Sequence, residues 1–398
     1  MPQATSSTGA TPPDVRLETP EAAGNHQKSP PAAPRRARLA ALDGLRFVAA
    51  AAVVLYHFTV RNSQAWGRPP AEVFPHLGEW AVYGALGPEL FFVISGFVIL
   101  MTAWGKTVTN VVASRVARLF PAYWAGVLLT GILLLWLWPT GKHVTLGQVV
   151  VNLTMLQSLV GVGNVDGVYW TLWAELRFYA LILLLVAWGV TRRRVLAFAS
   201  VWPAAALGAQ TVGPDALRTI LISDSAPLFA AGMVLYVIRH GGHSLVAWSL
   251  VAANTAASVW LVVPDQLVKQ ARNSDVAPSG LIVGSVVVAS IALVAVVTLT
   301  RVSRLSWRWL TTVGALTYPL YLVHEHWGWW AIAHLRALPP YLTLTLAAMF
   351  AIALAAGIHY GVENPLSPRI RRTVQSTLTR APDRRPSSPI GREFAHPD

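Results

Sequence analysis

The chain of 398 residues contains no cysteine and few charged residues. Without cysteine it can form no disulfide, no zinc–thiolate site and no thiol nucleophile. Charged residues make up 12% of the sequence, about half of the share that soluble proteins carry. Hydrophobic residues make up 54%, and the mean hydropathy is +0.48. This balance indicates a polytopic membrane protein.

The net charge of +13 does not require a nucleic-acid partner. Basic residues beside membrane spans usually set the topology, and we expect no nucleic acid among the partners. Residues 1–34 are rich in Pro, Ala, Ser and Thr and lack the apolar core of a signal peptide, which predicts a disordered cytoplasmic tail. Residues 373–398 predict a second such tail. Residues 35–372 would then form the membrane domain.

Between these tails lie ten apolar segments near the length of about 17–25 residues that a spanning helix needs. The sequence therefore predicts an all-α bundle of about ten transmembrane helices. The stretch 143–160 is shorter and more polar, and it predicts a re-entrant or interfacial piece. The ten segments lie near 39–59, 85–104, 120–138, 169–189, 195–212, 220–238, 245–263, 279–299, 312–334 and 341–361.

The flanking basic residues predict the orientation. If the N-terminus is cytoplasmic, the inner side receives Arg35, Arg36, Arg38, Lys106, Arg115, Arg118, Arg192, Arg193, Arg194, Arg239, Arg301, Arg304, Arg308, Arg369, Arg371 and Arg372. The outer side receives only Arg61, Arg68, Lys142, Arg218, Lys269, Arg272 and Arg336. This asymmetry follows the positive-inside rule. It predicts a plasma-membrane protein with both termini in the cytoplasm.

Ionisable residues inside the spans sort by depth into two clusters. Arg46 and His57 are eleven residues apart on the first span, which places them on one helix face, roughly 16 Å apart along the axis. The outer cluster has the residue types needed for general acid–base chemistry: His57, Glu89, Glu175, His324, Glu325 and His326. The inner cluster, dominated by arginine, suits phosphate binding: Arg46, Arg115, Arg118, His359 and Glu363.

Each cluster also has a purely structural interpretation. An intramembrane histidine can simply bond a neighbouring helix, and Arg115 and Arg118 can be topology anchors. Glu89 and Glu175 are harder to explain in this way, because a carboxylate in hydrocarbon needs a partner or a proton. His324 and His326 are two residues apart on a presumed helix and point to different sides, so we expect no metal site.

Several motifs in this order resemble the acyltransferase-3 family of integral membrane O-acyltransferases. They are Arg-x10-His in the first span, "GPELFFVISGFVI", the Arg-x-x-Arg of Arg115 and Arg118, "WTLWAELRFY", "YPLYLVHE" and "YGVENP". The resemblance covers roughly residues 38–372. It implies transfer of an acyl group, commonly acetyl, from cytoplasmic acyl-CoA to a hydroxyl of a carbohydrate, glycolipid or glycosylated natural product. Acyl-CoA would be a co-substrate, with no bound cofactor.

The resemblance also implies roles for individual residues. His57 would be the catalytic base or the residue that briefly carries the acyl group, with Glu89 or Glu175 orienting its imidazole. Arg46, Arg115, Arg118 and Glu363 would form the acyl-CoA site, and Tyr179, His324 and Glu325 are candidates for the acceptor site. The family commonly has Asp where this chain has Glu89.

Two other classes of protein also have sequences of this kind. A secondary transporter also uses ionisable groups in a helical bundle, but it predicts inverted repeats, and the two halves of the sequence show none. In a flippase or structural subunit that merely resembles the enzyme, loss of His57 would be silent.

Overall fold

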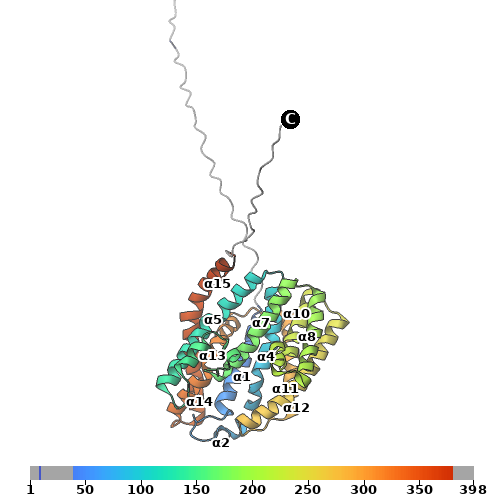
Figure 1. Ribbon diagram of the computed structural model, residues 1–398. Coiled ribbons are helices and arrows are strands. Elements are labelled where there is room, and N and C mark those ends of the chain that lie inside the picture. Colours follow the sequence, from blue (N-terminus) through green and yellow to red (C-terminus); the bar gives the residue numbers. More distant parts are fainter. Residues whose placement is uncertain (1–8, 10–38, 380–398) are drawn as a thin grey trace, which may run out of the picture. The chain divides into compact units, whose positions relative to one another are not determined.

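The computed structural model describes residues 39–379 and Gly9. Among these residues the only regular structure is helical (Figure 1). The principal helices are α1 (Ala40–Thr59), α2 (Pro70–Val73), α3 (Pro75–Ala81), α4 (Gly87–Ala103), α5 (Val108–Ile132), α6 (Leu146–Asn152), α7 (Trp170–Trp188), α8 (Arg192–Val212), α9 (Asp215–Leu221), α10 (Ala226–Gly241), α11 (Leu245–Asn273), α12 (Gly280–Leu299), α13 (Arg308–Leu335), α14 (Pro340–Ile358) and α15 (Asn364–Thr379). The fold class predicted from the sequence, an all-α polytopic bundle, is confirmed.

Nine helical stretches within residues 39–379 are long and apolar enough to cross a membrane. The remaining predicted span corresponds to α13, which is 28 residues long but more polar, because its second half carries His324, Glu325 and His326. The stretch 143–160 contains only the seven-residue helix α6 and a short 3₁₀ turn. The expected tail 1–34 lies outside the described residues except for Gly9. Of the expected tail 373–398, the structure describes only residues 373–379. These residues are helical and form the last part of α15.

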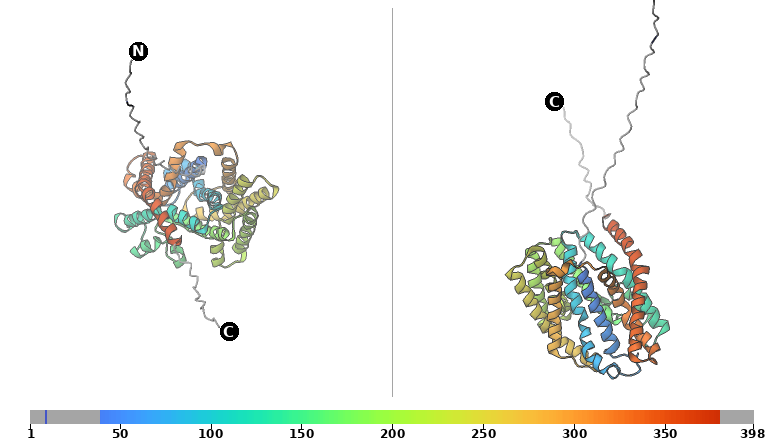
Figure 2. Two further views of the ribbon diagram at one scale, coloured as in Figure 1. Left: turned by 90° about the horizontal axis from the view of Figure 1, so that it is seen from above. Right: turned by 180° about the vertical axis from the view of Figure 1, so that it is seen from behind.

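Two groups of helices flank α1, α4 and α7. Helices α8, α10, α11 and α12 gather on one side, and α5, α13, α14 and α15 on the other (Figures 1 and 2). Helix α13 packs along α1, which brings His324 and Glu325 of α13 beside His57 of α1. Hydroxyl side chains cap several helix starts, as Thr107 does for α5 by accepting from Asn110 N.

Glycine allows the close contact between α4 and α10. A Cβ at Gly96 would lie 2.0 Å from the carbonyl oxygen of Phe229, and a Cβ at Gly232 would lie 2.0 Å from that of Val93. Small residues let membrane helices approach in this way and gain van der Waals contact where the hydrophobic effect gives no advantage. The approach fixes Glu89 and Ser95, both on α4, relative to the rest of the bundle.

This contact makes a stability prediction. Gly96→Ala should lower the thermal midpoint of the protein in lipid nanodiscs, because the added methyl forces α4 and α10 apart at a cost of about 1–3 kcal/mol. Gly357→Ala on α14 is the matched control, since its Cβ meets nothing within 4 Å. An equal midpoint for both variants would contradict the close packing.

Candidate active site

His57 lies near the end of α1, and its hydrogen bonds define the tautomer of its neutral ring. Its Nδ1 is 2.8 Å from the carbonyl oxygen of Val53, which can only accept, so Nδ1 carries the proton of the neutral ring. Trp329 Nε1 donates to the His57 carbonyl oxygen at 2.9 Å and fixes the backbone. The imidazole is buried, with 6% of the residue exposed. The unprotonated nitrogen is therefore Nε2, as a general base requires.

His324 supports this assignment from α13. Its Nδ1 lies 3.0 Å from Tyr321 O and 3.2 Å from Leu320 O, so that nitrogen carries a proton. Its Nε2 then accepts, and it lies 3.3 Å from His57 Nδ1. Both rings thus have one consistent tautomer, inferred from the network. The arrangement turns the lone pair of His57 Nε2 away from His324.

Glu325 is the carboxylate that faces this lone pair. Its Oε2 lies 3.8 Å from His57 Nε2, and no hydrogen-bond donor reaches Oε2 within the described part of the chain. Its Oε1 lies 3.5 Å from Nε of Arg61, in the segment that follows α1. Only 2% of the residue is exposed. A proton arriving on His57 would lie 3.8 Å from the Glu325 carboxylate, close enough for the two charges to attract each other.

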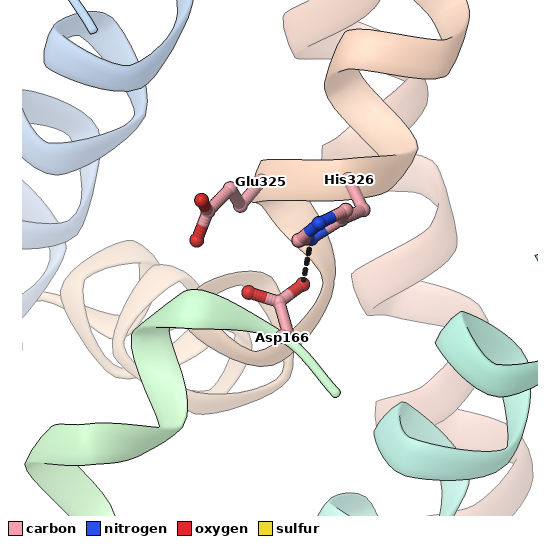
Figure 3. Close-up of side chains that lie close together, drawn as sticks. All are labelled: Asp166, Glu325 and His326. Carbon is pink, nitrogen blue, oxygen red and sulfur yellow. Dashed lines mark hydrogen bonds and ion pairs between the residues drawn. The ribbon is translucent and has the colours of Figure 1, made fainter. Parts of the chain in front are cut away.

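Asp166 and His326 form a second buried pair beside Glu325 (Figure 3). Asp166 Oδ2 accepts from His326 Nδ1 at 3.0 Å. Asp166 stands just before the helical turn that opens α7. Burial alone would raise the pKa of Asp166, but the charge and the hydrogen bond of His326 outweigh it and hold the pKa below its usual value. Asp166 is therefore ionised at neutral pH.

The ligand atoms of Asp166, Glu325 and His326 all lie within 4.8 Å of one another, close enough to share a metal ion. The donor set fits a metal poorly, because His326 Nδ1 and Asp166 already bond each other and Arg61 supplies a cation beside Glu325. The absence of a metal site stays a prediction.

A cavity of about 790 Å³, its solvent-open part included, runs from three arginines toward the His57 cluster, which consists of His57, Arg61, Asp166, His324, Glu325 and His326. We call it the arginine cavity. Its polar lining residues are Arg46, Ser95, Arg115, Arg118, Thr171, Glu175, Thr317, Tyr179, Tyr318 and Tyr321. Tyr321 stands at the histidine side, where its ring lies 5.8 Å from that of His324. The cavity thus leads from three arginines to the wall of the His57 cluster.

Glu175 and Tyr179 belong to the arginine cavity. Glu175 Oε1 accepts from Ser95 Oγ at 3.2 Å and from Tyr179 OH at 2.5 Å. The Arg115 guanidinium lies 5.8 Å from the centroid of the Tyr179 ring. The expected contact of Glu175 with His57 is not formed, because Glu175 bonds Ser95 of α4 and Tyr179 instead. The candidate acceptor residue Tyr179 is separated in the same way from His324 and Glu325, which flank His57.

Glu363 anchors the opposite end of the cavity. A π-helical turn, His359–Glu363, joins α14 to α15, and such turns often redirect side chains at functional sites. Glu363 Oε1 accepts from Arg118 Nη1, and its Oε2 lies 2.9 Å from His359 Nδ1. Arg118 also lies over the Tyr318 ring. The sequence grouped Arg118, His359 and Glu363 in the inner cluster, and in the structure these three residues contact one another through Glu363.

Glu89 is the main correction to the expected site. It accepts from Gln266 Nε2 at 3.0 Å, and its other oxygen is buried with no hydrogen-bond donor among the residues that the structure describes. A chain of donors runs to it from α1: Tyr56 OH donates to Gln270, and Gln270 donates to Gln266. Glu89 therefore faces α11 and does not orient the His57 imidazole. Glu325 is the glutamate that lies beside His57 Nε2.

The profile of the acyltransferase-3 family, described as an acyltransferase domain, matches residues 39–360. The chain belongs to the acyltransferase-3 family. No curated protein and no solved structure matches it. The match covers every helix from α1 to α14, and the chain is a membrane acyltransferase.

Proposed function

We propose that this acyltransferase-3 protein moves an acyl group, most simply acetyl, from cytoplasmic acyl-CoA to a hydroxyl of a carbohydrate, glycolipid or glycosylated natural product. One observation carries the proposal. The arginine cavity joins cationic side chains at one end to the wall of a histidine–carboxylate cluster at the other. A thioester donor with an anionic head and a long arm matches both ends.

The head of acyl-CoA would lie on Arg46, Arg115 and Arg118. Guanidinium groups bind phosphates with two parallel hydrogen bonds, and all three residues line the cavity. Arg46 and His57 stand on one helix, roughly 16 Å apart along its axis. The pantetheine arm is of comparable length and would pass between apolar walls that include Phe91, Phe92 and Leu119. The acyl carbonyl would then arrive near Tyr321 and His324.

His57 would act as the general base. Its Nε2 takes the proton of the acceptor hydroxyl as that oxygen attacks the thioester carbonyl carbon. The carbon–sulfur bond then breaks, and the imidazolium returns its proton to the CoA thiolate, so that the products are an ester and free CoA. Glu325 stabilises the imidazolium, which exists only during the reaction, and such differential stabilisation accelerates the chemical step.

Donor binding provides the first test. Arg115→Ala and Arg118→Ala should each weaken acetyl-CoA binding by about 1.5–3 kcal/mol, or about 10- to 150-fold in Kd. Arg46→Lys keeps the charge but loses the planar fork, so it should also weaken binding. The measurement is calorimetric titration of acetyl-CoA into protein held in nanodiscs. Arg193→Ala, an exposed arginine on α8, is the control. Equal affinities of all variants for acetyl-CoA would show that these arginines act only as topology signals.

Topology provides a second test. We propose a plasma-membrane location with both termini cytoplasmic, supported by the excess of basic residues on the inner side. A reporter that is active only in the cytoplasm, fused after Asp398, should be active in cells. Activity only of a reporter that works outside the membrane would overturn this orientation and the cytoplasmic source of the donor.

The transporter alternative gains no support. Among the described residues, the ionisable groups of the His57 cluster pair with one another rather than lining an open cavity.

A further inference from the structure

The connection between α5 and α7 is fixed at the end that meets α13. Lys142 Nζ donates to the carbonyl oxygens of Asn164, at 2.8 Å, and Val165, at 3.3 Å. The buried Asn152 side chain donates to Gly163 O and accepts from Val165 N, both at 3.0 Å. The backbone leading into residue 166 is therefore tied down by side chains from two other places in the same connection.

Asp166 uses both carboxylate oxygens. Its Oδ1 accepts from Val168 N at 3.2 Å and so caps the turn Gly167–Tyr169. Its Oδ2 accepts from His326 Nδ1 at 3.0 Å, which joins the turn to α13. Asp166 is fully buried and His326 is 2% exposed. Neither residue takes part in the proton transfers proposed above.

Gly167 places its backbone directly against Glu325. A Cβ at residue 167 would lie 2.8 Å from Glu325 Oε2 and 3.0 Å from Oε1, and its three nearest heavy atoms all belong to this carboxyl group. Oε2 is also the oxygen that lies 3.8 Å from His57 Nε2. The carboxylate is thus confined on three sides by Gly167, by Arg61 and by the imidazole.

We propose that Asp166 and Gly167 are positioning residues of the acyl-transfer site, which hold the Glu325 carboxylate against His57. Asp166 locks the turn onto His326, and the bare Gly167 backbone forms the wall on which the carboxylate rests. This inference rests on the proposed function. It assigns a task to the turn that leads into α7 and explains why residue 167 lacks a side chain.

Gly167→Ala tests whether the backbone of residue 167 positions the Glu325 carboxylate. The substrates are acetyl-CoA and methanol, a surrogate hydroxyl acceptor, with protein in nanodiscs. The readout is free CoA thiol, which has no protein background because the chain contains no cysteine. The added methyl should displace the carboxylate and lower kcat by about tenfold or more, since small misplacements cost that much. The Kd for acetyl-CoA should not change, because the donor head lies at the other end of the arginine cavity.

Gly163→Ala is the matched control from the same connection, because its Cβ would meet only Gln148 Nε2, at 3.9 Å. It should leave kcat unchanged. Asp166→Asn, which keeps the volume but loses the charge, should lower kcat at unchanged Kd even if Gly167→Ala melts early in a thermal scan.

A second-site change separates positioning from general damage. Glu325→Asp withdraws the carboxyl group by one methylene, which removes its contact with residue 167. Gly167→Ala should then cost less than about threefold in the Glu325→Asp background, a strong coupling between neighbours. An equal cost in both backgrounds, or wild-type kcat in Gly167→Ala and Asp166→Asn, would overturn the positioning role alone. Wild-type protein that releases no thiol would overturn the proposed function, and this inference with it.

Discussion

His57→Ala is expected to slow acyl transfer from acetyl-CoA by on the order of 10²–10⁴, the contribution of a general base. The physical reason is the tautomer. Val53 and His324 hold the proton on Nδ1, so Nε2 is the nitrogen available to take a proton from the acceptor. Alanine supplies no base, and the nearby Glu325 carboxylate is already paired with Arg61. The measurement is thiol release at saturating acetyl-CoA.

The variant should remain folded and should bind the donor normally. The imidazole makes no contact with the arginines that line the cavity, so the Kd for acetyl-CoA should stay within about twofold of wild type, the ordinary scatter of independent sites. His334→Ala is the control: it removes an exposed imidazole from the same helix that carries His324. If His57→Ala turned over like wild type, the general-base assignment would be wrong, and a transport or structural role would regain support.

The helices could be predicted from the sequence because each span is a continuous apolar run. All ten predicted segments correspond to helices, and the errors lie at the ends. Helix α5 begins at Val108 although its apolar run begins near residue 120, and α11 continues to Asn273 beyond a run that ends near residue 263. Helices continue past the hydrocarbon core with polar residues, and hydropathy does not detect those turns.

The relation between Arg46 and His57 could also be predicted, because both lie on one helix and helical geometry fixes their spacing. Contacts between helices could not, because the rotation of each helix about its axis depends on packing. The sequence therefore offered Glu89 or Glu175 as the partner of His57 and gave Glu325 only as a candidate for the acceptor site. The structure separates them: Glu89 faces Gln266, Glu175 faces Ser95, and only Glu325 reaches His57.

Arg61 and Asp166 were missed because both lie in connections, where a charged residue is unremarkable. Each had a signal that could have found it. Arg61 follows His57 by four residues, one helical turn. Asp166 is the last charged residue before the apolar run of α7 and stands at the position of a cap for its first turn. Neither signal predicts which residue of α13 is contacted, Glu325 by Arg61 or His326 by Asp166.

Glu325→Gln is expected to give the second largest loss of activity. Glutamine keeps the shape of the side chain and its fit against Gly167, but it removes the negative charge 3.8 Å from His57 Nε2. The neutral imidazole of the resting enzyme is little affected, whereas the imidazolium formed during transfer loses its counter-ion. A charge-assisted interaction of this kind contributes about 1.5–3 kcal/mol, so kcat should fall by about 10- to 150-fold while the Kd for acetyl-CoA is unchanged.

Glu89→Gln is the matched comparison, because it makes the same chemical change at another buried glutamate. An amide at residue 89 can still accept from Gln266 through its oxygen. No atom of Glu89 contacts His57, so kcat should fall less than about threefold, as expected for two sites that share no partner. The pair of variants therefore decides which carboxylate serves the histidine. A large loss in Glu89→Gln with near-normal turnover in Glu325→Gln would show that Glu89 of α4 is the carboxylate that serves His57. The charge on Glu325 would then have no part in stabilising the imidazolium, and α13 would contribute only packing at the site.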